Sequence, residues 1–589
     1  MRNGFSVLEV ILAVALFMIF STGAVTTVIQ SYNANRLGTE NTVASQFAAE
    51  GIEAVKSIKN RGYANLTNFN AVGLQRNNPG NYWEFKIEGT NNTLVHNSSD
   101  NYIRTVKLEN VNRDGSGNIV TSGGTLDPDT KKITSTVTWN FNSARPETTT
   151  LITYLSDWRK PITPERGGIL VYGDGGTSSD TIKYKLLDTS GNWGAAQPAA
   201  DIDTGTTNRA LRVARVFASS TRNEKILISK HYNGSTQYIY AQVFNGTSWT
   251  TPQLLSNWNA TTFINARNFE GAYLSNGNFM VVYSDNTTTP KMRTWNSSSW
   301  SPQSSTTIVG GIPVYIVARA RPGTNEVMMA TFDQANDTNT AYYNGSTWSA
   351  TTEHSAAAPT NTKEHIDFAW SSQNALKGAL VYPAAGTDNT QNLKIWTANG
   401  SGGGSWSGSL DAPTTGGRLG PVDIDARASA EEFMSCQKNA NNKIICFQAI
   451  TGPGWNTPTN NTLTNGTQTG IQRSYNFAYE TSGSEGIVVY SDNTSIPKLR
   501  KYVSSANSFD STPISLNTLG NTLATVRARP NPDTDDIFVL MATNNTLYSI
   551  EWDGTNNQMY TTAGRAFTTQ GTNGSSSTDF WYDFTWDKN

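Results

Sequence analysis

The order of apolar and polar residues predicts a long helix at the start of the chain. Residues 5–29 are almost wholly apolar, and Glu9 is the single charged residue among them. These 25 residues are enough to cross a hydrocarbon core of about 30 Å. Further apolar residues recur at steps of three to five, which predicts an amphipathic continuation. They are Val43, Phe47, Ile52, Val55 and Ile58. Basic residues just before Gly62 are typical of a helix end, so the helix is predicted over residues 5–62.

Four runs of alternating apolar and polar residues follow the helix. They lie at 82–88, 102–111, 132–141 and 148–155. Turn-forming residues separate them, which is typical of antiparallel strands. We therefore expect residues 63–157 to form a small antiparallel sheet on the apolar face of the helix, because neither element is stable alone in water. Two prolines and two glycines in residues 158–168 predict a linker.

Residues 169–589 contain an internal repeat. The segment VVYSDNT at 281–287 recurs at 488–494, and looser copies lie at 169–172 and 379–382. Units of a second type, which open on Ala and Arg residues, lie between these copies. Apolar strands begin near 169, 225, 280, 326, 379, 443, 487 and 536. Eight units of about fifty residues predict an eight-bladed β-propeller; seven blades and two smaller propellers are the alternatives.

The end of the chain predicts how the propeller closes. Units of the first type open on an aromatic strand, which the unit at residue 169 lacks. The segment Asp583-Phe584-Thr585-Trp586 has this aromatic pattern. We expect it to complete the first blade, which would remove a seam and protect edge strands.

The first residues resemble the processing site of type IV prepilins. A short leader with Arg2 ends at Gly4, then come Phe5, Glu9 and the apolar run. The resemblance implies that a prepilin peptidase removes residues 1–4 and methylates Phe5. It also implies that Glu9 pairs with the N-terminal amine of a neighbouring pilin subunit. The apolar run has no proline, so the kink common in major pilins is not expected. An ordinary membrane anchor is the alternative.

With this resemblance, the expected fold is an α+β pilin-like module followed by an all-β propeller. Hairpins such as Phe244-Asn245-Gly246-Thr247-Ser248-Trp249 and residues 343–348 are similar to the Asp-box turns of sialidase-like and lectin propellers. The Ser-x-Asp of that box is absent, so the similarity concerns the fold. The tryptophans either pack between blades or stack on sugars.

Charged residues recur on the opening strands of the units. Alternate units carry arginines, and the units between them carry acids or an amide. The residues are Arg215, Arg319, Arg427 and Arg527, and Glu270, Asp367, Asn476 and Asp583. If these strands line the central channel, acid and base alternate around it. Such a ring is either a structural set of salt bridges between blades or an anion or ligand site.

Other chemistry is sparse. Four histidines lack metal-ligand spacing, and no nucleophile elbow or phosphate loop occurs, so we predict no enzyme, cofactor or metal site. Cys436 and Cys446 would lie opposite each other in a hairpin centred on Asn441, as a disulfide or as two free thiols. Only 15% of residues are charged and the formal net charge is −2, which argues against nucleic-acid binding.

These patterns together predict a minor type IV pilin-like subunit that displays a large extracellular propeller for adhesion, with a glycan or protein as its ligand. It would lie in the cytoplasmic membrane before assembly and at the cell surface afterwards. A pseudopilin of a secretion or DNA-uptake system, with cargo on the propeller, shares the same N-terminus. A surface-tethered glycosidase is the third hypothesis.

Overall fold

The computed structural model describes two compact units, residues 1–162 and 163–589. The described residues are 6–77, 80, 82–96, 100–114, 118–142, 145–156, 167–173, 181–203, 209–356, 364–384, 391–400, 402–413, 420–439, 443–452, 454–464, 473–562, 564–572 and 580–587. Gly4, Phe5, residue 157 and residues 158–166 of the predicted linker lie outside them. Gly168, placed at the end of that linker by the sequence, is the first residue of a propeller strand.

The first unit contains one long helix, α1 (Val7–Arg61), which ends at Gly62 as predicted. Ser6 caps it: the Ser6 hydroxyl accepts from Leu8 N, and the Glu9 carboxylate accepts from Ser6 N at 3.0 Å. The two halves of α1 differ in burial. Phe17 and Phe20 are each 73% exposed, whereas Val55 is fully buried. Among the described helices, α1 is long and apolar enough to cross a membrane.

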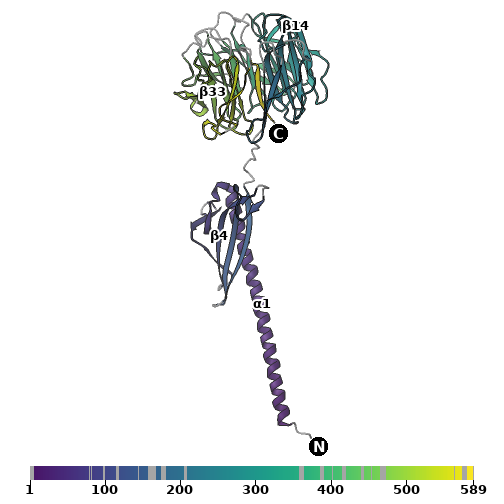
Figure 1. Cartoon of the computed structure of the whole chain (residues 1–589). Coiled ribbons are helices and arrows are strands. Elements are labelled where there is room, and N and C mark those ends of the chain that lie inside the picture. The colour runs from purple at the N-terminus through teal and green to yellow at the C-terminus, as the bar shows by residue number, and fades with distance from the viewer. Residues whose placement is uncertain are drawn as a thin grey trace. The chain divides into compact units, whose positions relative to one another are not determined.

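An antiparallel sheet covers the second half of α1 (Figure 1). Its strand order in the described residues is β2-β1-β4-β6-β7, with β3 and β5 paired to β4. The strands are β1 (Phe69–Asn77), β2 (Tyr82–Glu88), β3 (Asn92–His96), β4 (Asp100–Arg113), β5 (Ile119–Val120), β6 (Thr125–Asn142) and β7 (Arg145–Ser156), and a short 3-10 helix, η1 (Tyr63–Asn65), precedes them. The four predicted runs lie in β2, β4, β6 and β7. Strands β1, β3 and β5 were not predicted; in β1 the alternation is interrupted, because Val72, Gly73 and Leu74 are buried in succession.

Ile52, Val55 and Ile58 of α1 pack against Val106 of β4 and Ile133 of β6, and this contact forms the core of the unit. Burial on the helix begins at Glu40, so the sheet covers only the half that follows.

The described residues of the second unit form eight four- or five-stranded antiparallel sheets arranged as blades. Blade one contains β8 (Gly168–Gly173), β9 (Ile182–Leu187), β10 (Gln197–Pro198) and β42 (Tyr582–Trp586). Blade two contains β11 (Ala210–Ala218), β12 (Lys225–Tyr232), β13 (Thr236–Phe244) and β14 (Gln253–Asn259), and blade three β15 (Phe269–Tyr273), β16 (Phe279–Tyr283), β17 (Lys291–Trp295) and β18 (Ser304–Ser305). Blade four contains β19 (Pro313–Ala320), β20 (Val327–Asp333), β21 (Thr338–Tyr343) and β22 (Thr352–Ser355).

The second half of the ring follows the same plan. Blade five contains β23 (Asp367–Trp370), β24 (Lys377–Pro383), β25 (Gln391–Ala398), β26 (Gly404–Trp406) and β27 (Leu410–Asp411), and blade six β28 (Val422–Ala426), β29 (Glu432–Lys438), β30 (Ile444–Ile450) and β31 (Gly454–Asn456). Blade seven contains β32 (Tyr475–Tyr479), β33 (Glu485–Tyr490), β34 (Lys498–Val503), the 3-10 helix η2 (Ser504–Ala506), β35 (Ser508–Phe509) and β36 (Ile514–Ser515). Blade eight contains β37 (Thr525–Pro530), β38 (Ile537–Ala542), β39 (Thr546–Asp553), β40 (Gln558–Met559) and β41 (Thr568–Thr572).

The predicted eight-bladed propeller is therefore confirmed, with one correction in blade six. The sequence pattern took the strand at residue 443 as the equivalent of the other apolar strands. The structure gives this position to β29, which begins at Glu432, and makes the later strand β30 the third of the blade. With β29 as the equivalent strand, the spacing between equivalent strands along the chain becomes nearly constant.

The closing strand also lies where it was predicted. β42 pairs antiparallel with β8, from Tyr582 opposite Tyr172 to Trp586 opposite Gly168. Phe584 of β42 is fully buried and its ring lies 4.2 Å from that of Phe538 of blade eight. The two ends of the unit thus form one blade, and the core continues across it.

Replacing Phe584 with alanine should destabilise the propeller, because the substitution leaves a cavity at the closing blade. We expect the free energy of unfolding to fall by about 3–5 kcal/mol, measured by urea titration of tryptophan fluorescence. The control is Leu254→Ala, at a partly exposed position, which should change it by less than about 1 kcal/mol. Equal effects of the two variants would contradict this role of β42.

Candidate functional site

The first strands of the eight blades share an equivalent position, which is defined by the hairpin that follows each strand. Equivalent backbone hydrogen bonds close the hairpins that follow these strands in the even blades. The bonded pairs are Ser219 and Glu224, Arg321 and Glu326, Arg427 and Glu432, and Asn531 and Asp536. The equivalent position on each first strand lies four residues before the donor of this hydrogen bond. In the even blades it is occupied by Arg215, Val317, Asp423 and Arg527, and in the odd blades by Glu270, Asp367, Asn476 and Asp583.

Charged side chains at and near this position bridge neighbouring blades. Glu270 Oε1 lies 3.2 Å from Arg215 Nη2 of blade two, and Glu270 Oε2 lies 3.3 Å from Arg319 Nη1 of blade four. Arg319 Nη2 lies 3.3 Å from Asp367 Oδ1 of blade five. Arg473 Nη1 lies 3.9 Å from Asp367 Oδ2, so the contacts continue toward blade six.

The remaining contacts close the network. Arg473 Nη1 lies 3.0 Å from Asp423 Oδ1. Asn476 donates its Nδ2 to Asp423, and its Oδ1 accepts from Ala528 N of blade eight at 2.7 Å. Asp583 Oδ1 then lies 2.8 Å from Arg529 Nη2, and its Oδ2 lies 3.7 Å from Arg215 Nε. Contacts therefore run through all eight blades and return to the first.

A second layer strengthens the ring. Arg267 donates to Glu270 and Glu364, and Arg473 Nη2 lies 3.9 Å from Glu364 Oε2. The guanidinium of Arg527 lies 4.0 Å from the ring centre of Phe580. We call the charged residues of both layers the charge ring. In the described residues they are Arg215, Glu270, Arg319, Asp367, Asp423, Arg527, Arg529 and Asp583, with Arg267, Glu364 and Arg473.

The arginines keep Glu270 and Asp583 of the charge ring ionised. Burial alone would raise the pKa of Glu270, but Arg215, Arg267 and Arg319 outweigh it and lower the pKa to about 2. Burial alone would also raise the pKa of Asp583, but the charges of Arg529, Arg215 and Arg527 outweigh it and lower the pKa. Arg527 is 2% exposed; burial and the charge of Arg215 lower the pKa of its guanidinium. Buried charges of this kind are stable only when they are paired.

The charge ring corrects the predicted set in one place. Six of the seven predicted charged residues contribute to it, and Arg427 does not. Arg427 follows the end of its strand, where its Nη1 lies 3.2 Å from Glu432 Oε2 and donates to Ser504 at 2.9 Å. The Ala-Arg motif aligned Arg427 with Arg215, whereas the hairpin places Asp423 at that position. Arg267, Glu364, Arg473, Asp423 and Arg529 were missed.

Arg427 belongs instead to a group of clusters near the blade hairpins. In three even blades an acid accepts from a tyrosine hydroxyl and pairs with an arginine. Glu224 accepts from Tyr273 at 2.9 Å and pairs with Arg222; Glu432 accepts from Tyr479 at 2.8 Å and pairs with Arg427; Asp536 accepts from Tyr560 at 3.3 Å and pairs with Arg565. In the fourth, Glu326 pairs with Arg321.

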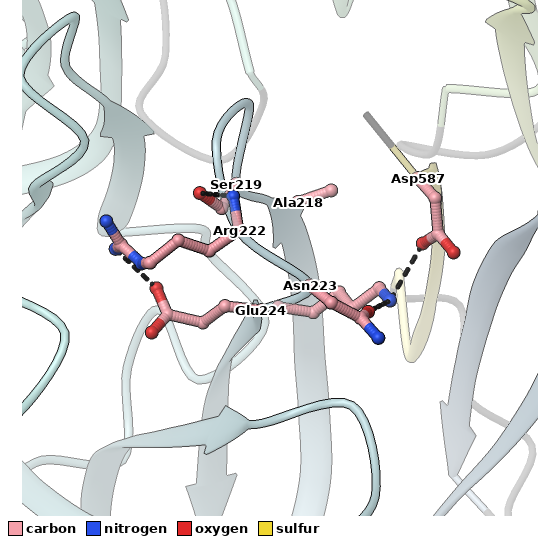
Figure 2. A pocket seen from close by; sticks show the side chains of 7 residues that line it. Ala218, Ser219, Arg222, Asn223, Glu224 and Asp587 are labelled. Atoms are coloured by element: carbon pink, nitrogen blue, oxygen red, sulfur yellow. Dashed lines mark hydrogen bonds and ion pairs between the residues drawn. The ribbon is translucent and has the colours of Figure 1, made fainter. Parts of the chain in front are cut away.

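Two cavities of the described propeller lie beside such clusters. One, of about 220 Å³, lies between blades one and two (Figure 2). There Arg222 pairs with Glu224, and Lys225 Nζ lies 2.9 Å from Asp587 Oδ1. The other, of about 240 Å³, lies between blades eight and one, beside Asp536 and Arg565. Both therefore flank the blade that β42 completes.

The tryptophans of the Asn-Gly hairpins pack within and between blades. Trp249 of blade two packs on Tyr184 of blade one with ring centres 5.6 Å apart, and Trp406 of blade five packs on His354 of blade four at 4.8 Å. These contacts favour the packing interpretation over sugar stacking.

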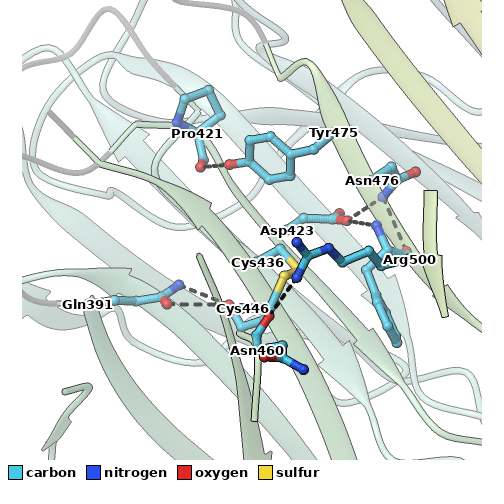
Figure 3. Close-up of a disulfide and its surroundings, with 11 residues drawn as sticks. Gln391, Pro421, Asp423, Cys436, Cys446, Asn460, Tyr475, Asn476 and Arg500 are labelled. Atoms are coloured by element: carbon cyan, nitrogen blue, oxygen red, sulfur yellow. Dashed lines mark hydrogen bonds between the residues drawn. A yellow bond between two sulfur atoms is a disulfide. The ribbon is translucent and has the colours of Figure 1, made fainter. Parts of the chain in front are cut away.

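Cys436 and Cys446 lie opposite each other on β29 and β30 and form a disulfide (Figure 3). Both are fully buried in the core shared with blade seven, so the bond is part of the packing of blade six.

No family model and no curated protein matches this chain. Solved propellers are similar to it in fold. The BP39L lectin from Burkholderia pseudomallei has a TM-score of 0.43 and 13% identity over 59% of this chain and 98% of its own. The fucose-specific lectin from Aleuria aurantia has 0.30 and 12% over 50% and 90%. The NanB sialidase from Streptococcus pneumoniae has 0.34 and 9% over 80% and 89%. Values this low carry no argument about function.

Replacing Asp583 with asparagine should destabilise the propeller strongly, because it leaves Arg215, Arg527 and Arg529 without their shared carboxylate. We expect a loss of about 3–5 kcal/mol in the free energy of unfolding, measured by urea titration. The control, Asp201→Asn, changes an exposed carboxylate and should cost less than about 1 kcal/mol. A folded Asp583→Asn protein of unchanged stability would point instead to a ligand role for the ring.

Stability should fall as the pH rises from about 4 to about 7, because of Asp425. Burial raises the pKa of this carboxyl to about 7, so the folded protein holds a proton that the unfolded chain releases near pH 4. Between about pH 4 and pH 7 the folded state loses that advantage, about 1–2 kcal/mol for a partly exposed group, and above this range the contribution stays constant. Thermal unfolding of Asp425→Asn should lack this contribution, whereas Asp201→Asn, at an exposed site, should follow the wild type. Parallel pH profiles for all three proteins would refute the assignment.

Proposed function

We propose that this chain is a minor subunit of a type IV pilus-like filament that displays its propeller for adhesion or ligand recognition. The contrast between the two halves of α1 carries the proposal. The sheet buries the second half, while the first half is apolar and exposed throughout the described chain. One half of the helix therefore packs on its own sheet, and the other half is left to contact molecules other than this chain.

Those surroundings must be apolar. Val7, Ile11, Phe17, Ile19 and Phe20 are all more than 60% exposed, which water disfavours by about 25 cal/mol per Å² of apolar surface. A bilayer covers such a helix before assembly, and the helices of neighbouring subunits cover it within a filament. This is the arrangement that the prepilin resemblance implies.

Glu9 lies at the start of this apolar half. Within the chain its carboxylate accepts a hydrogen bond from Ser6 N. A carboxylate in an apolar environment is costly and usually has a specific partner. We propose that the partner is the N-terminal amine of the next subunit, which becomes available when cleavage after Gly4 exposes Phe5.

We propose binding rather than catalysis for the propeller. Glu270 and Asp583 of the charge ring are held ionised between arginines. Asp425, whose pKa burial raises to about 7, accepts from Tyr479 N at 2.8 Å and lines neither of the two described cavities, so it is not placed to act as a general acid on a ligand there. The Cys436–Cys446 disulfide suits an oxidising compartment outside the cytoplasm, which agrees with display at the cell surface.

Replacing Glu9 with leucine should block assembly without blocking insertion or processing. In the parent cells, mass spectrometry of the variant should still find Phe5 as the methylated first residue. The sheared filament fraction should contain less than about a tenth of the wild-type amount. A tenfold loss corresponds to about 1.4 kcal/mol, and losing a desolvated ion pair costs more than that.

Two controls accompany Glu9→Leu. Glu53→Leu changes an exposed acid in the half of α1 that carries the sheet and should leave incorporation unchanged. Gly4→Leu should retain the leader and stay in the membrane. Normal incorporation of Glu9→Leu, or an unprocessed wild-type chain, would refute the filament role.

A further inference from the structure

The cavity between blades eight and one has the features of a binding site for a small ligand. Its wall is formed by Leu187 and Gly191 of blade one, Trp586 of the closing strand, and residues of blade eight. Gly191 and Gly564 both have positive φ angles, and a Cβ on Gly564 would lie 2.3 Å from Gly191 O. Trp193 Nε1 donates to Gly564 O at 3.1 Å. The two blades are therefore joined closely here, and the cavity is preformed.

The charges of the cavity exclude ionic ligands. Arg565 Nε donates to Glu551 at 2.6 Å, and its Nη2 donates to Asp536 at 2.6 Å. Its guanidinium also lies 3.6 Å from the ring centre of Tyr560. One arginine between two carboxylates leaves a local charge of −1, which repels anions. A cationic ligand would have to compete with Arg565, which already pairs with both acids, so we take a neutral ligand as the best fit.

The rest of the lining combines aromatic rings with small polar groups. Tyr560 and Trp586 present aromatic carbon, and Asn531, Thr534 and Thr555 present amide and hydroxyl groups. Aromatic faces attract the C–H groups of a sugar ring, and planar amides, carboxylates and hydroxyls bond its hydroxyl groups. The volume of about 240 Å³ lies below the range of roughly 300–1,000 Å³ typical of drug-sized ligands.

We propose that this cavity binds one neutral sugar ring, as the terminal residue of a surface glycan. The proposal rests on the recognition role proposed above for the propeller and names its ligand class. The corresponding cavity between blades one and two is less suited: Lys225 and Asp587 pair within it, and no aromatic residue lines it among the residues described. Figure 2 shows the charged and polar side chains that line that site.

The test uses the full chain in lipid nanodiscs, since many detergents carry sugar headgroups. Saturation-transfer NMR and calorimetry would compare the methyl glycosides of glucose, galactose, mannose and fucose with N-acetylneuraminic acid and choline. Thr555→Trp should plug the cavity from an exposed turn. Its matched control is Thr247→Trp, at the same place in the Asn-Gly turn of blade two. Thr555→Gln serves as a smaller plug, and thermal unfolding checks the fold of each variant.

We expect at least one neutral glycoside to bind wild type and Thr247→Trp equally, and Thr555→Trp at least tenfold more weakly. Binding that Thr555→Trp and Thr555→Gln leave unchanged would overturn the site while leaving the recognition role standing. Binding of only N-acetylneuraminic acid or choline would overturn the ligand class. Absence of any binding by a chain that still enters filaments would overturn the sugar proposal and not the filament role.

Discussion

The propeller depends on the pairing of β42 with β8. This strand pair joins residues about 410 positions apart in the chain and turns an open array of blades into a ring. It also brings Asp583 to the charge ring, where a single carboxylate serves three arginines. Both cavities lie beside the blade that it completes. Without β42 the ring, its buried charges and both cavities would lose one side.

The same pairing limits how the propeller is attached. Asp587 N donates to Gly167 O at 2.8 Å, so the chain enters and leaves the described propeller at neighbouring points of blade one. The other seven blades have no covalent link to the first unit. The proposed membrane helix and the proposed recognition module are therefore joined by a single stretch of chain.

Much of this fold could be predicted from residue patterns because the patterns are local. The apolar run and its amphipathic continuation give the bounds of α1 almost to the residue, and the aromatic segment around Phe584 gives the closing strand. Arg427 was misplaced because a short Ala-Arg motif does not report where a hairpin turns. The cavities could not be predicted at all, since Leu187, Asp536 and Trp586 meet only after the ring closes.

The filament role is the central claim, and its most direct test is to locate the propeller on the cell. Surface filaments would be sheared from cells that carry this chain and labelled with gold-conjugated antibodies against residues 169–589. We expect gold on the sheared fibres, at their tips or along their length. Gold that stays on the cell envelope, with none on fibres, would contradict the filament role and favour a secretion pseudopilin or a simple membrane anchor.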